Sequence, residues 1–196
     1  LSPKFLVQPQ TEPMFTYTLD ESMPDHHILK EVNKDESPKA VVGIRPCDAS
    51  AFLLVKRNFD APQYQDPYWL KAYNAMTFVG FACNDPCGTC FCTSAGCGPF
   101  HEAGLDVLLV DIGDRFLAKA LTDKGNAFLA AAGWKAQADD AGKIDSLKQA
   151  AESKLGSRVS TENLQANETT QIYDAPFWED TAFSCINFLC FSLESL

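Results

Sequence analysis

Cysteines are the residues of this 196-residue chain whose type and spacing could do chemistry. Five of the eight lie within residues 83–97, one precedes them at Cys47, and Cys185 and Cys190 lie near the C-terminal end. The first residues carry neither a basic stretch nor an apolar stretch typical of an export signal, so we expect a cytoplasmic protein with reduced thiols. In that setting, grouped cysteines indicate metal ligands or redox groups rather than a disulfide framework. The five in the group are Cys83, Cys87, Cys90, Cys92 and Cys97.

Three kinds of site are compatible with residues 83–97. An iron–sulfur cluster needs four thiolates around a compact inorganic core, and Gly88 and Gly96 would let backbone amides approach its sulfur atoms. A structural zinc ion also takes four thiolates, and the Cys87-x-x-Cys90 spacing suits it. The same pair could instead be a redox-active dithiol, although two further cysteines crowd it and a poor helix-forming sequence follows it. The residues alone leave all three chemistries open.

The segment before Cys47 predicts how that residue is positioned. Residues 40–45 form a continuous apolar run, typical of a strand buried on both faces, which ends at Arg45-Pro46-Cys47-Asp48. Asp48 can then cap a helix over residues 49–59. Cys47 is therefore expected just beyond the carboxyl end of a buried strand.

A second strand predicts the position of Cys83. A helix over residues 66–75, with Pro67 in its first turn, leads into an apolar run at 77–82 that ends on Cys83. A strand–helix–strand unit of this length favours parallel pairing. Cys47 and Cys83, 36 positions apart, should then lie side by side where open α/β sheets bind their ligands.

The rest of the chain completes an α/β domain, which we place at residues 1–170. We expect a mixed, largely parallel sheet with helices and with the cysteine-rich loop at the carboxyl ends of its strands. The predicted elements are edge strands or extended arms at 5–9 and 14–19, a loop at 20–38, strands at 107–111 and 115–118 joined at Gly113-Asp114, a helix at 123–132 between Thr122 and Gly133, and a helix at 139–155.

Composition and charge exclude several classes of function. The chain is 46% hydrophobic and contains no apolar run of about eighteen residues, so we expect a soluble protein without direct membrane insertion. Acidic residues outnumber basic ones by 26 to 16, and a net charge of −10 disfavours nucleic acid. The same charge would suit docking on basic patches of redox partners, or simply keep the chain in solution. No glycine-rich nucleotide-binding motif is present.

Several motifs together resemble one known family. Gly43-Ile44-Arg45-Pro46-Cys47-Asp48, Asp66-Pro67-Tyr68, Cys83 and Thr89-Cys90-Phe91-Cys92-Thr93-Ser94 occur in an order and spacing similar to the iron–sulfur subunits typified by the β subunit of sulfhydrogenase and its counterpart in anaerobic sulfite reductase, which contain two or more [4Fe-4S] clusters. Residues 104–114 and 122–125 extend the resemblance over most of the chain.

The resemblance implies a function and a ligand set. The family passes electrons between a flavoprotein or ferredoxin and a catalytic subunit of the hydrogenase, sulfite reductase or heterodisulfide reductase type, without catalysing bond chemistry itself. The matching ligands of one [4Fe-4S] cluster are Cys47, Cys83, Cys90 and Cys92, with Cys87 and Cys97 as additional thiols near it. A zinc-stabilised structural or docking subunit without a redox role is the alternative.

The C-terminal residues 171–196 depart from that family. Residues 177–187 resemble the start of a two-cluster ferredoxin segment, in which several C-x-x-C repeats should follow, but only Cys185 and Cys190 are present. Two cysteines do not complete a four-thiolate cluster. We expect either a remnant of a ferredoxin-like segment or one that this sequence contains only in part.

Overall fold

A computed structural model describes residues 3–134, 141–155 and 176. The chain divides into two units, Leu1–Arg158 and Val159–Leu196, and the fold below is that of the first. Apart from Pro176, the predicted C-terminal segment, including Cys185 and Cys190, lies outside the described residues.

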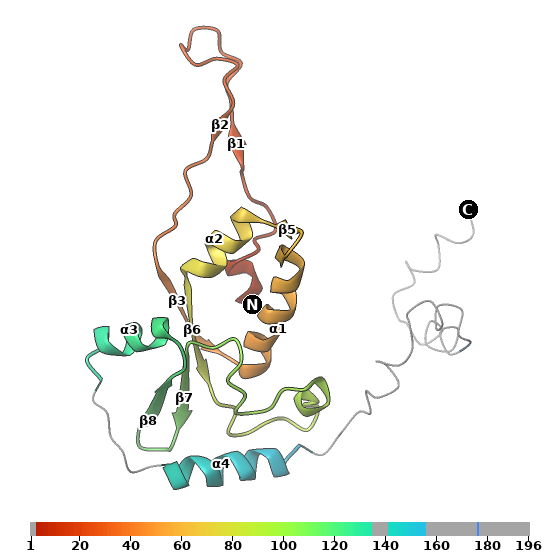
Figure 1. The fold of residues 1–196 in the computed structure, drawn as a ribbon, viewed down its shortest axis with the longest axis vertical. Helices are drawn as coiled ribbons and strands as arrows, with labels where there is room; N and C mark the ends of the chain where they lie inside the picture. The colour runs from red at the N-terminus through yellow and green to blue at the C-terminus, as the bar shows by residue number, and fades with distance from the viewer. Residues whose placement is uncertain (1–2, 135–140, 156–175, 177–196) are drawn as a thin grey trace. The chain divides into compact units, whose positions relative to one another are not determined.

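A four-stranded sheet forms the centre of the fold (Figure 1). Its order is β3-β6-β7-β8; β3 pairs with β6 and β6 with β7 in parallel, while β7 and β8 are antiparallel. This confirms a mixed α/β fold with a largely parallel sheet. The strands are β3 (Lys39–Ile44), β6 (Met76–Phe81), β7 (Val107–Asp111) and β8 (Phe116–Ala120).

Helices pack on both faces of this sheet because side chains alternate along its central strands. Phe78 and Leu108 belong to a cluster that includes residues of α1 (Pro46–Phe59), α2 (Pro67–Ala75) and α4 (Ala141–Ser153). Their neighbours Val79 and Val107 pack with side chains of α3 (Asp123–Ala131). The crossover from β3 through α1 and α2 to β6 thus joins two parallel strands, as the sequence predicts.

The prediction that β3 is buried on both faces is wrong. β3 is an edge strand; Ile44 is buried, whereas Val42 is 59% exposed. The register shifts between Val42 and Ile44, and Gly43 lies there at φ 93°, a conformation that glycine adopts readily. This bulge turns Ile44 to the same core as Val41. The apolar run therefore reflects one buried face and a bulge rather than two covered faces.

Three local predictions also differ from the structure. Residues Pro3–Leu6 form a 3₁₀ turn, η1, instead of an extended strand, because Pro3 suits a first helical turn. Helix α1 begins at Pro46 with Arg45 as its N-cap, so Asp48 lies in the first turn and does not cap it. A short hairpin, β4 (Asp60–Ala61) with β5 (Tyr64–Gln65), separates α1 from α2 and was not predicted.

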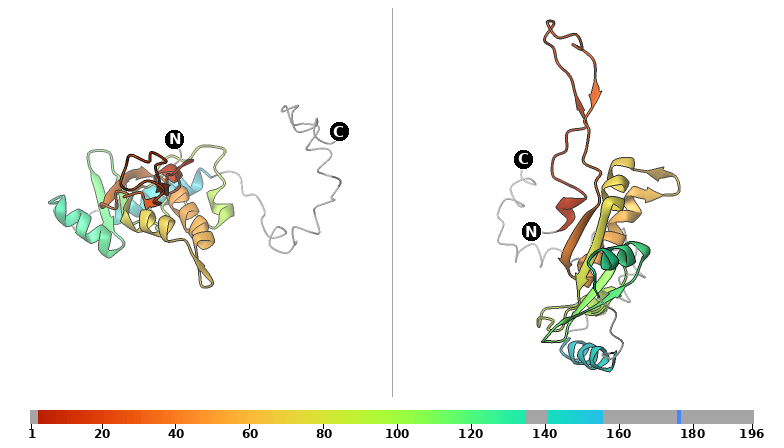
Figure 2. Two further views of the ribbon diagram at one scale, coloured as in Figure 1. Left: turned by 90° about the horizontal axis from the view of Figure 1, so that it is seen from above. Right: turned by 90° about the vertical axis from the view of Figure 1, so that its left-hand side faces the viewer.

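An antiparallel pair, β1 (Phe15–Thr16) and β2 (Lys30–Glu31), forms the base of a long arm. We call residues 11–37 the arm; it extends away from the four-stranded sheet in two views (Figure 1 and Figure 2). Seven of its large apolar side chains are between 42% and 66% exposed: Met14, Phe15, Tyr17, Leu19, Met23, Ile28 and Leu29.

No helix in the described ranges has the length and apolar character needed to cross a membrane.

Candidate metal centre

The parallel strands bring Cys47 and Cys83 to one edge of the sheet. Cys47 is the second residue of α1 and follows the end of β3 by three positions, while Cys83 follows the end of β6 by two. Ile44 and Gly80 are opposite each other in the register of the two strands. Both thiols therefore come from segments that leave the sheet at the carboxyl ends of neighbouring strands, a usual location for ligand sites.

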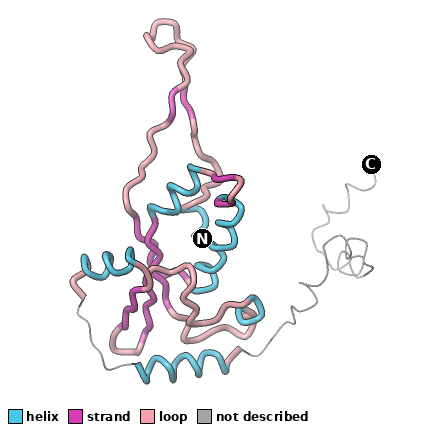
Figure 3. Tube along the Cα trace, viewed as in Figure 1, coloured by secondary structure: helices cyan, strands magenta, loops and turns pink. Residues whose placement is uncertain are grey.

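Residues 83–97, which we call the cysteine loop, are mostly irregular (Figure 3). A turn at residues 87–90 is closed by the Cys90 amide, which donates to the Cys87 carbonyl at 3.0 Å. The 3₁₀ turn η2 (Cys92–Ala95) follows and ends at Gly96, with φ 72°. Since Cys90 and Cys92 are not in a regular strand, they are not forced to opposite sides of the chain.

Hydrogen bonds hold the first residues of the cysteine loop against the rest of the domain. The Cys83 amide donates to the Pro99 carbonyl at 2.9 Å, and the Asn84 side chain donates to the Asp111 carbonyl at 2.6 Å. Asp85 pairs at 2.7 Å with Lys154, the residue after the end of α4, and this hydrogen bond lowers the pKa of the Asp85 carboxyl. The start of the loop is thereby fixed relative to β7 and α4.

Cys97, Cys47 and Cys92 lie near one another at the start of α1. The Cys97 sulfur is 3.5 Å from the hydroxyl of Ser50, which is three residues after Cys47 and so on the same helix face. The Cys97 amide donates to the Cys92 carbonyl at 2.9 Å. The pKa of the Cys47 thiol is raised, first by partial burial and then by Asp48 and Cys97; burial and then Cys97 raise the pKa of Cys92.

Cys87 and Cys90 form a second group. Their sulfur atoms are 3.1 Å apart, and the Cys87 sulfur is 3.3 Å from the Thr89 hydroxyl. Hydrogen bonds from Thr89 and then from Cys90 lower the pKa of Cys87 to about 7, while the pKa of Cys90 is raised, chiefly by Cys87. Cys83 lies within electrostatic range of both groups, since it contributes to the raised pKa values of Cys90 and Cys92.

The donor chemistry at this site suits a thiolate-bound group. All six cysteines in the described part of the chain are free thiols. Thr93 follows Cys92, and its hydroxyl is buried without a hydrogen-bond partner among the described residues, as is the side-chain oxygen of Asn84. A buried hydroxyl without a partner can donate to a bound sulfur atom. Among the described residues, however, no three His, Cys, Asp or Glu side chains converge as a metal ion requires, so the thiols lie near one another without surrounding one point.

The predicted set of Cys47, Cys83, Cys90 and Cys92 is divided between the two groups. Cys47 and Cys92 lie with Cys97, whereas Cys90 contacts Cys87. Neither Ser50 nor Lys154 was predicted from the sequence to belong to this region. The three-residue spacing from Cys47 could have indicated Ser50, but nothing in the sequence connects Lys154 with Asp85, 69 positions earlier.

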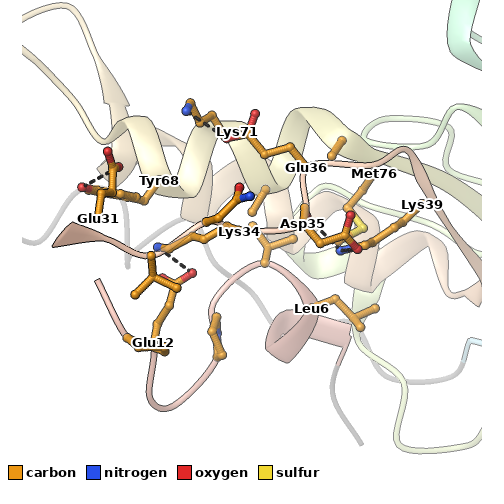
Figure 4. A pocket seen from close by; sticks show the side chains of 17 residues that line it. Leu6, Glu12, Glu31, Lys34, Asp35, Glu36, Lys39, Tyr68, Lys71 and Met76 are labelled. Carbon is orange, nitrogen blue, oxygen red and sulfur yellow. Dashed lines mark hydrogen bonds and ion pairs between the residues drawn. The ribbon is translucent and has the colours of Figure 1, made fainter. Parts of the chain in front are cut away.

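A pocket of about 510 Å³ lies at the opposite ends of the parallel strands (Figure 4). Its lining includes Lys39 and Met76, the first residues of β3 and β6, together with residues of η1, α2 and the arm. Its three lysines are each paired with a carboxylate: Lys34 with Glu12 at 2.9 Å, Lys39 with Asp35 at 3.1 Å and Lys71 with Glu36 at 2.9 Å. These internal pairs leave no lysine charge in it uncompensated, and we assign it no ligand.

No protein-family model, curated protein or solved structure matches the chain.

Proposed function

We propose that the protein is an electron-transfer subunit that holds a [4Fe-4S] cluster on Cys47, Cys83, Cys90 and Cys92. The observation that carries this proposal is the parallel pairing of β3 with β6, which brings Cys47 to the same sheet edge as Cys83 and the cysteine loop. Thiols from two distant segments at one strand-end site are what a cluster of four thiolate ligands needs. The resemblance in the motifs around these residues supports the same ligand set.

The chain's own groups would hold and adjust the bound cluster. Cys47 and Cys92 would bind from the start of α1 and from η2, and Cys90 would have to turn from Cys87 toward them. The unpartnered Thr93 hydroxyl could donate to a cluster sulfur and raise the reduction potential by offsetting negative charge. When bound, the cluster supplies a one-electron carrier.

The electron donor and acceptor would be other subunits of a cytoplasmic redox complex, including a flavoprotein and a hydrogenase-type or reductase-type subunit. The arm supports such an assembly because it exposes seven large apolar side chains, and exposed apolar patches are typical of protein interfaces. Residues 11–37 also carry seven acidic and two basic side chains. A partner surface that accepts the arm would therefore be apolar with a basic rim.

Anaerobic purification followed by metal analysis tests the proposal. We expect iron and acid-labile sulfide in matching amounts, and an EPR signal of a reduced cluster after dithionite treatment. Cys47→Ser should lose most of this signal, whereas Cys87→Ser, which changes a thiol outside the ligand set, should keep it. Zinc without sulfide would overturn the proposal and leave a zinc-stabilised structural subunit.

A further inference from the structure

Cys87 and Cys90 have a backbone geometry that can form a disulfide. A β-turn brings its first and fourth Cα atoms to within about 7 Å, and a disulfide spans Cα atoms roughly 4.4–6.8 Å apart. Their sulfur atoms, 3.1 Å apart, have to approach by about 1 Å to form an S–S bond. A Cβ placed on Gly88 meets no heavy atom within 4 Å, so the second residue of the turn is not packed against the rest of the domain.

The contact between their sulfur atoms distinguishes this pair from the other thiols, since Cys47 is exposed as well. Cys87 is exposed and Cys90 is half-buried, so a reagent from solution can reach the first sulfur. Cys97 contacts Ser50 and the Gly98 carbonyl, and its neighbour Cys92 is half-buried. Among the described cysteines, Cys87 and Cys90 are the pair whose sulfur atoms lie within hydrogen-bond distance of each other.

We propose that Cys87 and Cys90 are a thiol–disulfide exchange site that takes an external disulfide as its substrate. The Cys87 thiolate attacks one sulfur of the external disulfide, which releases one thiolate and leaves a mixed disulfide on Cys87. Cys90, having lost its proton to solvent, then attacks the Cys87 sulfur and releases the second thiolate. The protein dithiol is oxidised by two electrons, and the external disulfide is reduced to two thiols that take up the two protons.

The consequence for the metal centre rests on the function proposed above. Cys90 belongs to the proposed ligand set, and a disulfide to Cys87 removes its thiolate. Oxidised protein therefore has three of the four ligands and does not complete the cluster. Reduction of the Cys87–Cys90 disulfide restores the fourth ligand, so this site couples cluster assembly to the thiol redox state of the cell.

Differential alkylation of the full-length chain tests the disulfide itself. The iron-free protein is incubated with glutathione disulfide, or in a parallel sample with oxidised thioredoxin, and free thiols are blocked before reduction and relabelling. We expect the number of alkylatable thiols to fall by two, and mass spectrometry to place the second label on Cys87 and Cys90. Oxidation by glutathione disulfide identifies a small-molecule disulfide as a substrate. Oxidation by oxidised thioredoxin alone identifies a protein disulfide instead.

Matched variants complete this test. Cys97→Ser should still form the disulfide, whereas Cys87→Ser and Cys90→Ser should not. A second label on any other pair, or no loss of thiols with either oxidant, overturns the inference.

Iron uptake separates this inference from the proposed function. Wild-type protein treated first with glutathione disulfide should bind several-fold less iron and sulfide during reconstitution than Cys87→Ser treated in the same way, and dithiothreitol should remove the difference. Equal uptake would contradict the coupling. If no preparation forms a cluster, the proposed function fails, and the alkylation result still decides whether the exchange site exists.

Discussion

Four thiols of the candidate site, Cys47, Cys87, Cys90 and Cys92, have pKa values shifted by their surroundings. The Thr89 hydroxyl lowers the pKa of Cys87, whereas partial burial raises the pKa values of Cys47 and Cys92. If Cys47 and Cys92 bind iron, as proposed, binding must release their protons, so affinity for the metal should rise with pH. The spacing of the cysteines predicts that they gather, but these differences depend on side-chain contacts that spacing does not contain.

The pH dependence of alkylation measures the lowered pKa of Cys87 against the raised pKa values of Cys47 and Cys92. Because the thiolate is the reacting form and the pKa of Cys87 is about 7, its reaction with iodoacetamide should reach half its maximal rate near pH 7. Cys47 and Cys92, whose pKa values are raised, should react only at clearly higher pH. Thr89→Ala should slow labelling of Cys87 at pH 7 several-fold, since it removes the main stabilising hydrogen bond. Mass spectrometry measures the labelling rate of each cysteine. The same pH dependence at Cys47, Cys87 and Cys92 would contradict the lowered pKa of Cys87.

At the scale of the elements, the sequence predicts most of what positions Cys47 and Cys83. The apolar runs at 40–45 and 77–82 correspond to β3 and β6 within one residue at each end, and their parallel pairing is confirmed. These predictions succeed because strand length, apolar pattern and crossover length are local properties of the sequence.

Burial of β3 was not predictable in the same way. An edge strand and a central strand can have the same apolar run, and only the order β3-β6-β7-β8 shows that nothing pairs beyond β3 in the described chain. The division of the cysteines into two groups was not predictable either. It depends on the turn at residues 87–90, in which one backbone hydrogen bond brings Cys90 to Cys87. The sequence shows which thiols are near but not which of them touch.

The bulge at Gly43 should be sensitive to any side chain. Gly43→Ala should lower the free energy of unfolding by roughly 1–2 kcal/mol, because its φ of 93° is unfavourable for a residue with a Cβ atom. Gly142, near the start of α4, has open space around it, and Gly142→Ala should instead increase the free energy of unfolding by up to about 1 kcal/mol. Urea denaturation measures both; equal effects would show that the backbone conformation at Gly43 is not what matters.

The arm should contribute little to the stability of the domain. Replacing residues 17–29 with Asn-Gly leaves Thr16 and Lys30 paired across a two-residue hairpin turn. We expect the melting temperature to change by less than about 3 °C, because the removed apolar side chains are exposed. By contrast, Phe52→Ala removes a side chain that is only 2% exposed, and it should lower the free energy of unfolding by about 3–5 kcal/mol. A large loss of stability on shortening would show that the arm is part of the fold.

At the scale of the whole molecule, the charge of −10 should govern encounters with small redox reagents. Oxidation of the reduced, cluster-loaded protein by hexaammineruthenium(III), a cation, should slow as ionic strength rises, whereas oxidation by ferricyanide, an anion, should accelerate. Shortening the arm removes Asp20, Glu21 and Asp25 and changes the net charge from −10 to −7. The rates with both reagents should then depend less on ionic strength. Stopped-flow rates that respond to salt in the same direction for both reagents would contradict this.

The parallel pairing of β3 with β6 also sets an order of events during folding. The thiols of residues 83–97 are close in sequence and can meet early, but Cys47 joins them only after the intervening crossover of α1 and α2 has closed. Closing that connection costs chain entropy before any contact at its ends is gained. If Cys47 is a ligand, as proposed, a metal captured by the loop alone would lack that ligand, and the arrival of Cys47 would act as a kinetic checkpoint that reserves the finished centre for chains that have already folded.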